Sequence, residues 1–360
     1  MPTAACTPRT LSLSRAVSLA LLAVAPTHSF AQPEDSTAER LDAIEVVGRS
    51  VSGTYYADEA AGAKSALPLR ELPQSVRVLS RQAIDDLGAL RLSDTVDYVG
   101  GVSRQNNFGG LWDNLALRGL PGNENTGSAL LLNGFSANRG FNAPRDTADV
   151  ERFEFLKGPA SALYGSSEPG GTVNLVSKRP LWQPASSIEL YGGSHAFRRA
   201  AFDSTAPVGE SFAWRLNAAM EDRASFRDVV NQQRRLLAPA FTWKLGLDTE
   251  LNYVGQWLRH EAVLDRGVPA INGQLGIVPV ERFNGEPADG RVRLQNAQHQ
   301  LSIDHALSEV WSLRGALSRK DGSLRGFSTE PSLVEADGRT LRRQRRFRDY
   351  ASDDTALQVE

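Results

Sequence analysis

The chain has 360 residues, of which 41% are hydrophobic, and 40 basic residues nearly balance 42 acidic ones to give a net charge of −2. This balance excludes a globally basic surface of the kind that attracts nucleic acid, so we expect no nucleic-acid partner. The mean hydropathy of −0.32 excludes a protein built from membrane-spanning helices, which need long apolar runs.

The N-terminus is typical of a secretory signal peptide. Two arginines precede a ten-residue apolar run at 16–25, and "THSFA" then places the small residues Ser29 and Ala31 where a signal peptidase reads them. We therefore expect residues 1–31 to be removed on export; the alternative is a buried N-terminal helix. The only cysteine, Cys6, falls inside this segment, so the exported chain would have neither a disulfide nor a cysteine–metal site.

Residues 32–66 are polar and rich in small side chains, a composition that predicts a flexible segment. One stretch at 42–48, "DAIEVVG", differs, because Ile44 and Val46 alternate with Glu45 as in a strand. The stretch is either a minor edge strand of this protein or a strand that adds itself to a partner's sheet.

Residues 67–180 predict a compact mixed α/β unit. "SVRVLS" alternates as a strand, and "RQAIDDLGA" and "RLSDTVDYV" have helical spacing, the second with Ser93 as its expected N-cap. Short strands follow in "LALRG", "ALLLNGF", "VERFEFLKG" and "GTVNLVSK", and the turns between them are rich in Gly, Asn and Pro.

Four glycines mark the turns at the end of this unit, where positive φ or close backbone approach would exclude a Cβ: Gly158, Gly165, Gly170 and Gly171. The stretch "GSSEPGGT" is similar to a phosphate-binding loop, but Gly171 stands where the lysine is required. The sequence also has no H-E-x-x-H or G-x-S-x-G motif, and its histidines are scattered. We therefore expect neither an enzyme nor a protein-bound metal.

Residues 181–360 alternate in segments of about ten residues, as transmembrane β-strands do. In "SFAWRLNAAM" one face carries five apolar residues: Phe212, Trp214, Leu216, Ala218 and Met220. "ELNYVGQWL" and "VWSLRGALSRK" alternate in the same way, and tight turns such as "APVGES" contrast with a long polar connection at 261–291. The pattern predicts about eight strands of an outer-membrane barrel; the alternative is a soluble β-sandwich.

The segment "VERFEFLKGPASALYGSSEPGGTVNLVSKRP" resembles the end of the plug domain of TonB-dependent outer-membrane receptors, especially ferric-siderophore receptors. "LPQSVRVLS", "LALRG" and "LLLNGF" match the same family in order and spacing, and the resemblance covers residues 42 to about 205. It implies a mixed α/β plug domain at 67–180 followed by antiparallel transmembrane β-barrel strands at 181–360. It also implies a location in the bacterial outer membrane, with outer-membrane lipid around the strands.

The resemblance further implies TonB-dependent active transport of a ferric siderophore. Iron would arrive as the chelate, so no cofactor is expected. The alternatives are haem, cobalamin or another metal chelate as cargo, or a porin-like or degenerate surface protein without energy coupling. About eight strands fit after Pro180, whereas a plugged barrel of this kind needs about 22. We therefore expect the chain to be part of a receptor about twice as long.

Two sets of site residues follow from the resemblance. In the family a short extended box pairs with TonB, the inner-membrane energy transducer, and here it corresponds to Asp42, Ala43, Ile44, Glu45, Val46 and Val47. The positions expected to contact the ligand are Trp112, Arg118, Asn138, Arg139, Phe141, Asn142 and Tyr164. The arginines would donate to anionic chelate oxygens and the aromatics would pack on the chelate frame. The alternative for each is an arginine paired with a barrel-wall carboxylate or an aromatic in the plug core.

Overall fold

The structure is a computed structural model that describes residues 55, 57, 59–64, 67–122, 130–137, 142–159, 161–164 and 168–360. The predicted signal peptide and the predicted TonB box lie outside the described residues. Four of the candidate residues also lie outside them: Asn138, Arg139, Phe141 and Gly165.

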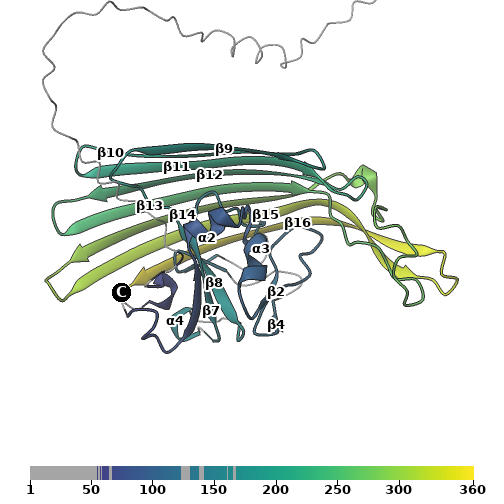
Figure 1. The fold of residues 1–360 in the computed structure, drawn as a ribbon, viewed down its shortest axis with the longest axis horizontal. Helices are drawn as coiled ribbons and strands as arrows, with labels where there is room; N and C mark the ends of the chain where they lie inside the picture. Colours follow the sequence, from purple (N-terminus) through teal and green to yellow (C-terminus); the bar gives the residue numbers. More distant parts are fainter. Residues whose placement is uncertain are drawn as a thin grey trace, which may run out of the picture. The chain divides into compact units, whose positions relative to one another are not determined.

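The first part of the chain forms two small sheets, drawn in purple to teal in Figure 1. A five-stranded sheet has the order β1-β7-β8-β5-β6, and its neighbours are antiparallel except for the parallel pair β5 and β8. Its strands are β1 (Ser75–Leu79), β5 (Leu130–Leu132), β6 (Phe135–Ser136), β7 (Val150–Lys157) and β8 (Gly171–Ser177). The second sheet contains β2 (Val102–Arg104), β3 (Leu115–Leu117) and β4 (Leu120–Pro121). Every strand predicted in this unit is present, which confirms the mixed α/β plug fold.

Short helices connect these strands: η1 (Ala61–Ala63), α2 (Arg81–Asp86), α3 (Leu92–Thr95), η2 (Val96–Tyr98) and α4 (Ser161–Tyr164). Ser80 caps α2, because its hydroxyl accepts a hydrogen bond from the Ala83 amide at 3.3 Å. The predicted N-cap at Ser93 is wrong. Helix α3 begins at Leu92 with Arg91 as its N-cap, two residues earlier than predicted, and the Asp94 carboxylate accepts from the Arg91 amide at 3.0 Å. A carboxylate in the first turn also suits the helix dipole, and Asp94 stands there as the N3 residue rather than as the N-cap.

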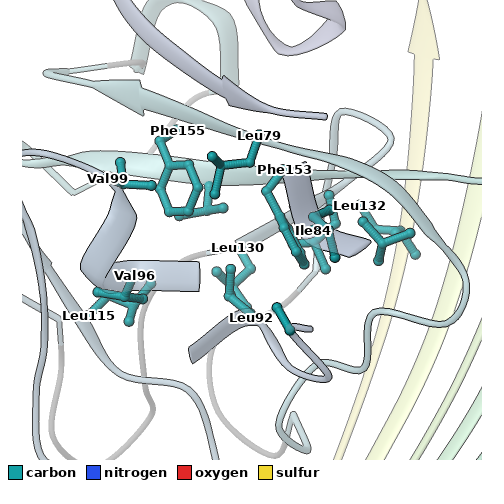
Figure 2. Close-up of a cluster of buried hydrophobic side chains, with 14 of the residues drawn as sticks. Leu79, Ile84, Leu92, Val96, Val99, Leu115, Leu130, Leu132, Phe153 and Phe155 are labelled. Atoms are coloured by element: carbon teal, nitrogen blue, oxygen red, sulfur yellow. The ribbon is translucent and has the colours of Figure 1, made fainter. Parts of the chain in front are cut away.

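The core of this unit lies between the five-stranded sheet and helices α2 and α3. Figure 2 shows Phe153 and Phe155 of β7 pointing into it, together with Ile84 and Leu92 from the helices. Each of these four side chains is fully buried. Burial of such a side chain stabilises a fold by about 1.5–3 kcal/mol, so the cluster holds the plug together as a folded unit.

The second part of the chain forms an eight-stranded sheet, here called the strand wall. Its strands are β9 (Ala185–Gly193), β10 (Phe197–Val208), β11 (Phe212–Ala224), β12 (Asn231–Lys244), β13 (Thr249–Ala262), β14 (Val292–Ala306), β15 (Ser312–Val334) and β16 (Leu341–Val359). Each strand pairs antiparallel with the next, and they lie side by side in chain order in Figure 1. The expected eight strands are confirmed, although β15 and β16 are about twice as long as the predicted ten residues.

The two faces of the strand wall differ as the alternation predicts. On β11, Asn217 and Glu221 are buried on the face toward the plug, whereas Met220 on the opposite face is 62% exposed. The connections alternate too. Turns such as 209–211 and 245–248 are short at one end, and the connection between β13 and β14 at the other end spans 263–291. In outer-membrane barrels short turns face the periplasm, so we call the ends of the wall the inner and the outer end.

Candidate functional site: the contact between plug and strand wall

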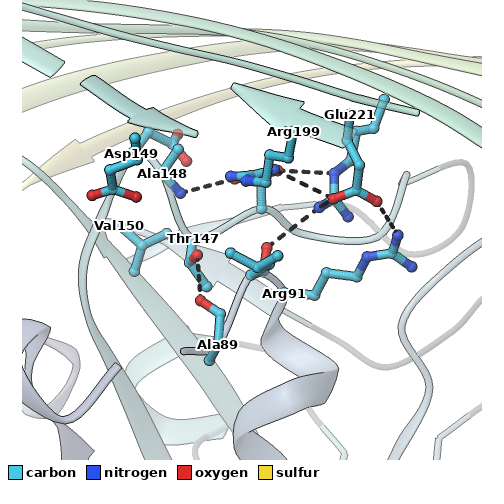
Figure 3. Close-up of polar contacts among 12 residues, drawn as sticks. Ala89, Arg91, Thr147, Ala148, Asp149, Val150, Arg199 and Glu221 are labelled. Atoms are coloured by element: carbon cyan, nitrogen blue, oxygen red, sulfur yellow. Dashed lines mark hydrogen bonds and ion pairs between the residues drawn. The ribbon is translucent and has the colours of Figure 1, made fainter. Parts of the chain in front are cut away.

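Five charged side chains form a buried ion cluster between plug and wall: Arg91 and Asp146 from the plug, and Arg199, Glu221 and Arg234 from the wall (Figure 3). Arg199 donates two hydrogen bonds to Asp146, at 2.8 and 2.6 Å, and Arg234 lies 2.8 Å from the same carboxylate. On the other side Glu221 accepts from Arg234 at 2.8 Å and from Arg91.

Each charge in the ion cluster is stabilised by its oppositely charged partners, so the cluster depends on all of its members. Burial alone would raise the pKa of Asp146, but Arg234 and Arg199 hold that pKa well below its usual range. Both wall arginines are almost inaccessible to solvent, so neither can exchange its carboxylate for water while the plug is in place. Removing one member of such a buried pair typically costs about 3–5 kcal/mol, because a charge remains without its partner. The cluster therefore fixes the plug against β10, β11 and β12.

A second polar group lies next to the ion cluster, around Arg145 and Asp149 of the plug. The Arg145 guanidinium donates to Gln256 of β13 at 3.0 Å, and its backbone amide donates to Asp113 at 2.8 Å. Gln256 in turn donates to Asp149 at 2.5 Å. Burial raises the pKa of Asp149 to about 6, and the nearby Asp146 carboxylate adds to the shift. This carboxyl therefore titrates near neutral pH while it contacts the wall.

Amide side chains and one lysine of the wall make further hydrogen bonds with the plug. Asn296 accepts from the Ala143 amide at 2.9 Å, and Gln300 donates to the Leu132 carbonyl at 2.8 Å. Lys320 of β15 donates to the Ala137 carbonyl and to Asn142. The plug thus meets the wall through polar groups over much of its surface. Such a contact can be exchanged for water with a smaller penalty than an apolar one.

The contact becomes apolar and aromatic toward the outer end. Phe108 and Trp112 of the plug stack with ring centroids 4.3 Å apart, and both belong to a buried cluster with wall residues such as Leu258. The guanidinium of Arg266, from the long connection, lies 4.3 Å from the Phe108 ring centroid. Arg266 also pairs with Glu330 of β15 at 2.9 Å. The connection at 263–291, the strand wall and the plug therefore meet at Phe108.

The N-terminal end of the described plug is held at Gly62. Glu154 of β7 accepts from the amides of Ala61 at 3.0 Å and Gly62 at 2.7 Å. The Tyr164 hydroxyl donates to the Gly62 carbonyl at 2.6 Å. Gly62 lies within the segment at 32–66 that was predicted to be flexible, yet it is bound to the plug through both of its backbone polar groups.

The four described ligand candidates lie in different surroundings. Trp112 and Asn142 are buried in the contact with the wall, and Asn142 accepts from Arg145 at 3.1 Å. Tyr164 lies by Gly62 and by Lys64 and Glu360, near the inner end. Arg118 is exposed beside Gly158. The structure does not gather them into one pocket, and their contact with a ligand stays a prediction.

The turn glycines have a steric reason. A Cβ on Gly171, whose φ is +139°, would lie 2.3 Å from the Leu156 carbonyl oxygen. A Cβ on Gly170 would lie equally close to the Leu117 carbonyl oxygen, and one on Gly158 would lie 2.9 Å from Arg118. At Gly170 and Gly171 the neighbouring backbone leaves no room for a Cβ, and at Gly158 the φ of +104° favours glycine.

No local sequence pattern identifies the members of the ion cluster. They come from segments up to 143 positions apart, Arg91 to Arg234, and no local spacing connects them. One signal was available, because Arg199, Glu221 and Arg234 each fall on the polar face of an alternating strand. A charge on that face needs a partner inside the barrel, but the sequence does not say which.

Comparisons with known proteins agree with this architecture. Residues 68–172 match the family model described as TonB-dependent Receptor Plug Domain. The metal-pseudopaline receptor CntO of Pseudomonas aeruginosa strain UCBPP-PA14 is 43% identical over 85% of this chain and 43% of its own length. The ferrioxamine receptor of Yersinia enterocolitica is 29% identical over 88% of this chain and 46% of its own. The crystal structure of the ferric-catecholate import receptor Fiu from Escherichia coli superposes with a TM-score of 0.76, at 23% identity over 85% of this chain and 46% of Fiu.

The chain therefore carries the plug domain of a TonB-dependent outer-membrane receptor, followed by eight strands of its barrel. It spans less than half the length of the curated relatives it matches. The same assignment confirms the prediction of a receptor rather than an enzyme. In the described part of the chain no helix is long and apolar enough to cross a membrane. Nor do three metal-ligating side chains gather there.

Proposed function

We propose that the receptor to which this chain belongs imports a metal chelate across the outer membrane, with energy supplied through TonB. The observation that carries the proposal is a plug domain held against barrel strands by hydrogen bonds and ion pairs. A plug bound in this way can be displaced by a pulling force, because water replaces the polar partners that it loses. The 43% identity to a metal-pseudopaline receptor supports a metal chelate as the cargo.

The pull would enter through the predicted TonB box, Asp42 to Val47, and reach the plug at Gly62. Both backbone polar groups of Gly62 are bound to the plug, by Glu154 and Tyr164. Earlier in the chain the Tyr55 hydroxyl donates to Asp86 and the Ala61 amide donates to Glu154. At Gly62 both backbone polar groups are bound, so force on the flexible segment would act on the plug fold there. Displacement would then require the ion cluster to open, since it holds the plug against three strands.

The cargo we favour is a metal–pseudopaline complex, because the identity to that receptor is 43% over 310 residues. A ferric siderophore is the second candidate, supported by the 29% identity to ferrioxamine receptors. In either case Arg118, which is exposed, would donate to anionic oxygens of the chelate.

Uptake assays with a panel of chelates test this proposal. Cells that carry the receptor as their only route for the chelate are given pseudopaline loaded with radiolabelled metal, or ferrioxamine with radiolabelled iron. We expect accumulation of the metal–pseudopaline complex and little of ferrioxamine; the reverse preference would make a ferric siderophore the cargo. Accumulation of neither chelate above that of receptor-free cells would contradict import of metal chelates of these two kinds.

A box variant tests the energy coupling separately. Val46→Pro removes a strand hydrogen bond and should abolish uptake while chelate binding to whole cells is retained. Ser50→Pro, in the same polar segment but outside the box, is the control and should transport normally. Undiminished uptake by the Val46→Pro variant would refute the box assignment.

A further inference from the structure

One aromatic side chain of the plug, Phe108, is contacted by three parts of the chain at the outer end. Its ring stacks on Trp112, with 6° between the two ring planes. The guanidinium groups of Arg266 and Arg348 lie 4.3 and 5.0 Å from the centroid of the same ring, within the range of a cation–π contact. Arg266 belongs to the connection at 263–291 and Arg348 belongs to β16. This one side chain therefore fastens the plug to two parts of the receptor.

One carboxylate, Glu330 of β15, pairs with both of these guanidinium groups. Its Oε2 accepts from the Arg266 Nε at 2.9 Å, and its Oε1 accepts from Arg348. The three side chains differ in their access to solvent. The side chain of Arg266 is 25% exposed, against 9% for Glu330 and 5% for Arg348. A ligand that arrives from outside the cell would therefore reach Arg266 before the other two.

Arg266 also supports the backbone turn that carries Phe108, in the plug apex at 105–112. The φ of Phe108 is +52°, a left-handed conformation that is uncommon for a residue with a Cβ. Asn106 stabilises this turn, because its side-chain oxygen accepts from the Phe108 amide at 2.9 Å. The same oxygen accepts from the Arg266 guanidinium at 3.3 Å. Removing Arg266 thus takes contacts away from both the ring and the turn of the plug apex.

The backbone of the plug apex is joined to the same connection. The Asp265 amide donates to the Gly109 carbonyl at 3.3 Å, one residue before Arg266. A Cβ on Gly109, whose φ is +68°, would lie 2.9 Å from the Asp265 nitrogen. Asp265 is in turn held by Arg227, which follows β11 and donates to its carboxylate at 2.7 Å. A force that draws the plug inward would therefore be resisted at the apex as well as at the ion cluster.

We propose that the plug apex is a latch, and that a carboxylate of the metal chelate releases it by drawing Arg266 away from Glu330 and from the Phe108 ring. This inference rests on the proposed import of a metal chelate and names the group of the cargo that the receptor selects. A guanidinium binds a cargo carboxylate as it binds Glu330, through charge-assisted hydrogen bonds. Glu330 keeps Arg348 when Arg266 leaves, so no buried carboxylate loses its last counter-charge. The outer fastening of the plug would thus be released only in a receptor that carries cargo.

Single-molecule pulling on the complete receptor in a lipid bilayer tests the latch. The receptor is pulled from its N-terminal end at constant force, and the rate of plug displacement is recorded with and without saturating metal–pseudopaline. We expect the chelate to raise this rate about tenfold in wild type. Arg266→Gln should raise the rate by a similar factor without chelate, and the chelate should then add no further increase. Arg282→Gln, which changes another exposed arginine of the same connection, should behave as wild type.

Chelate affinity distinguishes a latch from a contact that is only structural. Because Glu330 and the chelate compete for Arg266, Glu330→Gln should bind metal–pseudopaline about tenfold more tightly than wild type. Arg266→Gln should bind it about tenfold more weakly, since the donor itself is lost. A contact that only held the fold together would weaken binding in both variants.

Equal displacement rates for wild type and Arg266→Gln without chelate would refute the latch, and so would a chelate effect of the same size in both proteins. Resistance to unfolding in detergent shows whether each variant is folded. If Glu330→Gln is not, Arg266→Gln alone decides, because its side chain is the most exposed of the three. If wild type does not bind metal–pseudopaline, the proposed cargo is wrong, and the rates without chelate still decide whether the apex is a latch.

Discussion

Replacing Glu221 by glutamine removes one of the two carboxylates that hold three arginines between plug and wall. Glu221 accepts from Arg234 at 2.8 Å and from Arg91, and its side chain is almost inaccessible to solvent. After the change only Asp146 remains as a counter-charge for the three buried or half-buried guanidinium groups. We expect the plug to open from the wall more easily while the plug core in Figure 2 stays folded.

The free-energy cost of the Glu221→Gln change follows from the burial of the Glu221 side chain. Breaking a buried ion pair by removing one partner costs about 3–5 kcal/mol. Since about 1.36 kcal/mol corresponds to a factor of ten, the opened population should rise roughly 150- to 5,000-fold. Part of this cost disappears when a second charge is removed. Glu221→Gln combined with Arg91→Gln should therefore be less destabilised than the sum of the two single changes.

Hydrogen exchange measured by mass spectrometry reads out this opening. Amides of the plug that face the wall, around Asp146 and in α2, should exchange at least a hundredfold faster in Glu221→Gln. Asp222→Asn is the matched control, because Asp222 is the next residue on β11 and is exposed on the opposite face. Exchange in Glu221→Gln within threefold of wild type would refute the role given to the ion cluster.

Three further changes test other contacts of the plug. Because the pKa of Asp149 is raised to about 6, the folded protein loses stability as pH rises from about 4 to 6 and this carboxyl ionises. The Asp149→Asn variant should therefore be more stable than wild type by up to about 3 kcal/mol at pH 7.5, but by little at pH 4. Thermal melts that show the same difference at both pH values would contradict this. Gly171→Ala should yield almost no folded receptor, because its Cβ meets a backbone oxygen at 2.3 Å, whereas Gly192→Ala should fold; the heat-resistant fraction on gels compares the two. Tyr164→Phe loses the hydrogen bond to the Gly62 carbonyl and should speed local exchange about fivefold, for a loss of about 1 kcal/mol; unchanged exchange there would exclude this anchor.

The strands of this chain could be predicted because their signal is local. A period of two along residues 212–220 assigns the lipid-facing side, and the structure places the same residues there. The lengths of β15 and β16 could not be predicted. Their outer halves leave the apolar band and carry charges such as Arg325 and Arg345, which hide the alternation.

The site could be predicted less completely than the fold. The resemblance of the glycine-rich segment identified the plug, but the partners of each buried charge depend on register between strands far apart in sequence. The paired charges of Asp146 and Arg199 illustrate this, since 53 residues separate them. Trp112 could not be assigned for a different reason. An aromatic residue in a polar loop can contact a ligand or pack in a core, and only its stacking on Phe108 in the structure shows that it is packed.

The central claim is energised import of a metal chelate, and uptake with and without a proton gradient tests it most directly. Cells carrying the complete receptor take up radiolabelled metal–pseudopaline, before and after a protonophore collapses the gradient. The account predicts that accumulation stops while the chelate stays bound at the cell surface. Accumulation that continues at the same rate without the gradient would contradict it and would indicate a passive pore.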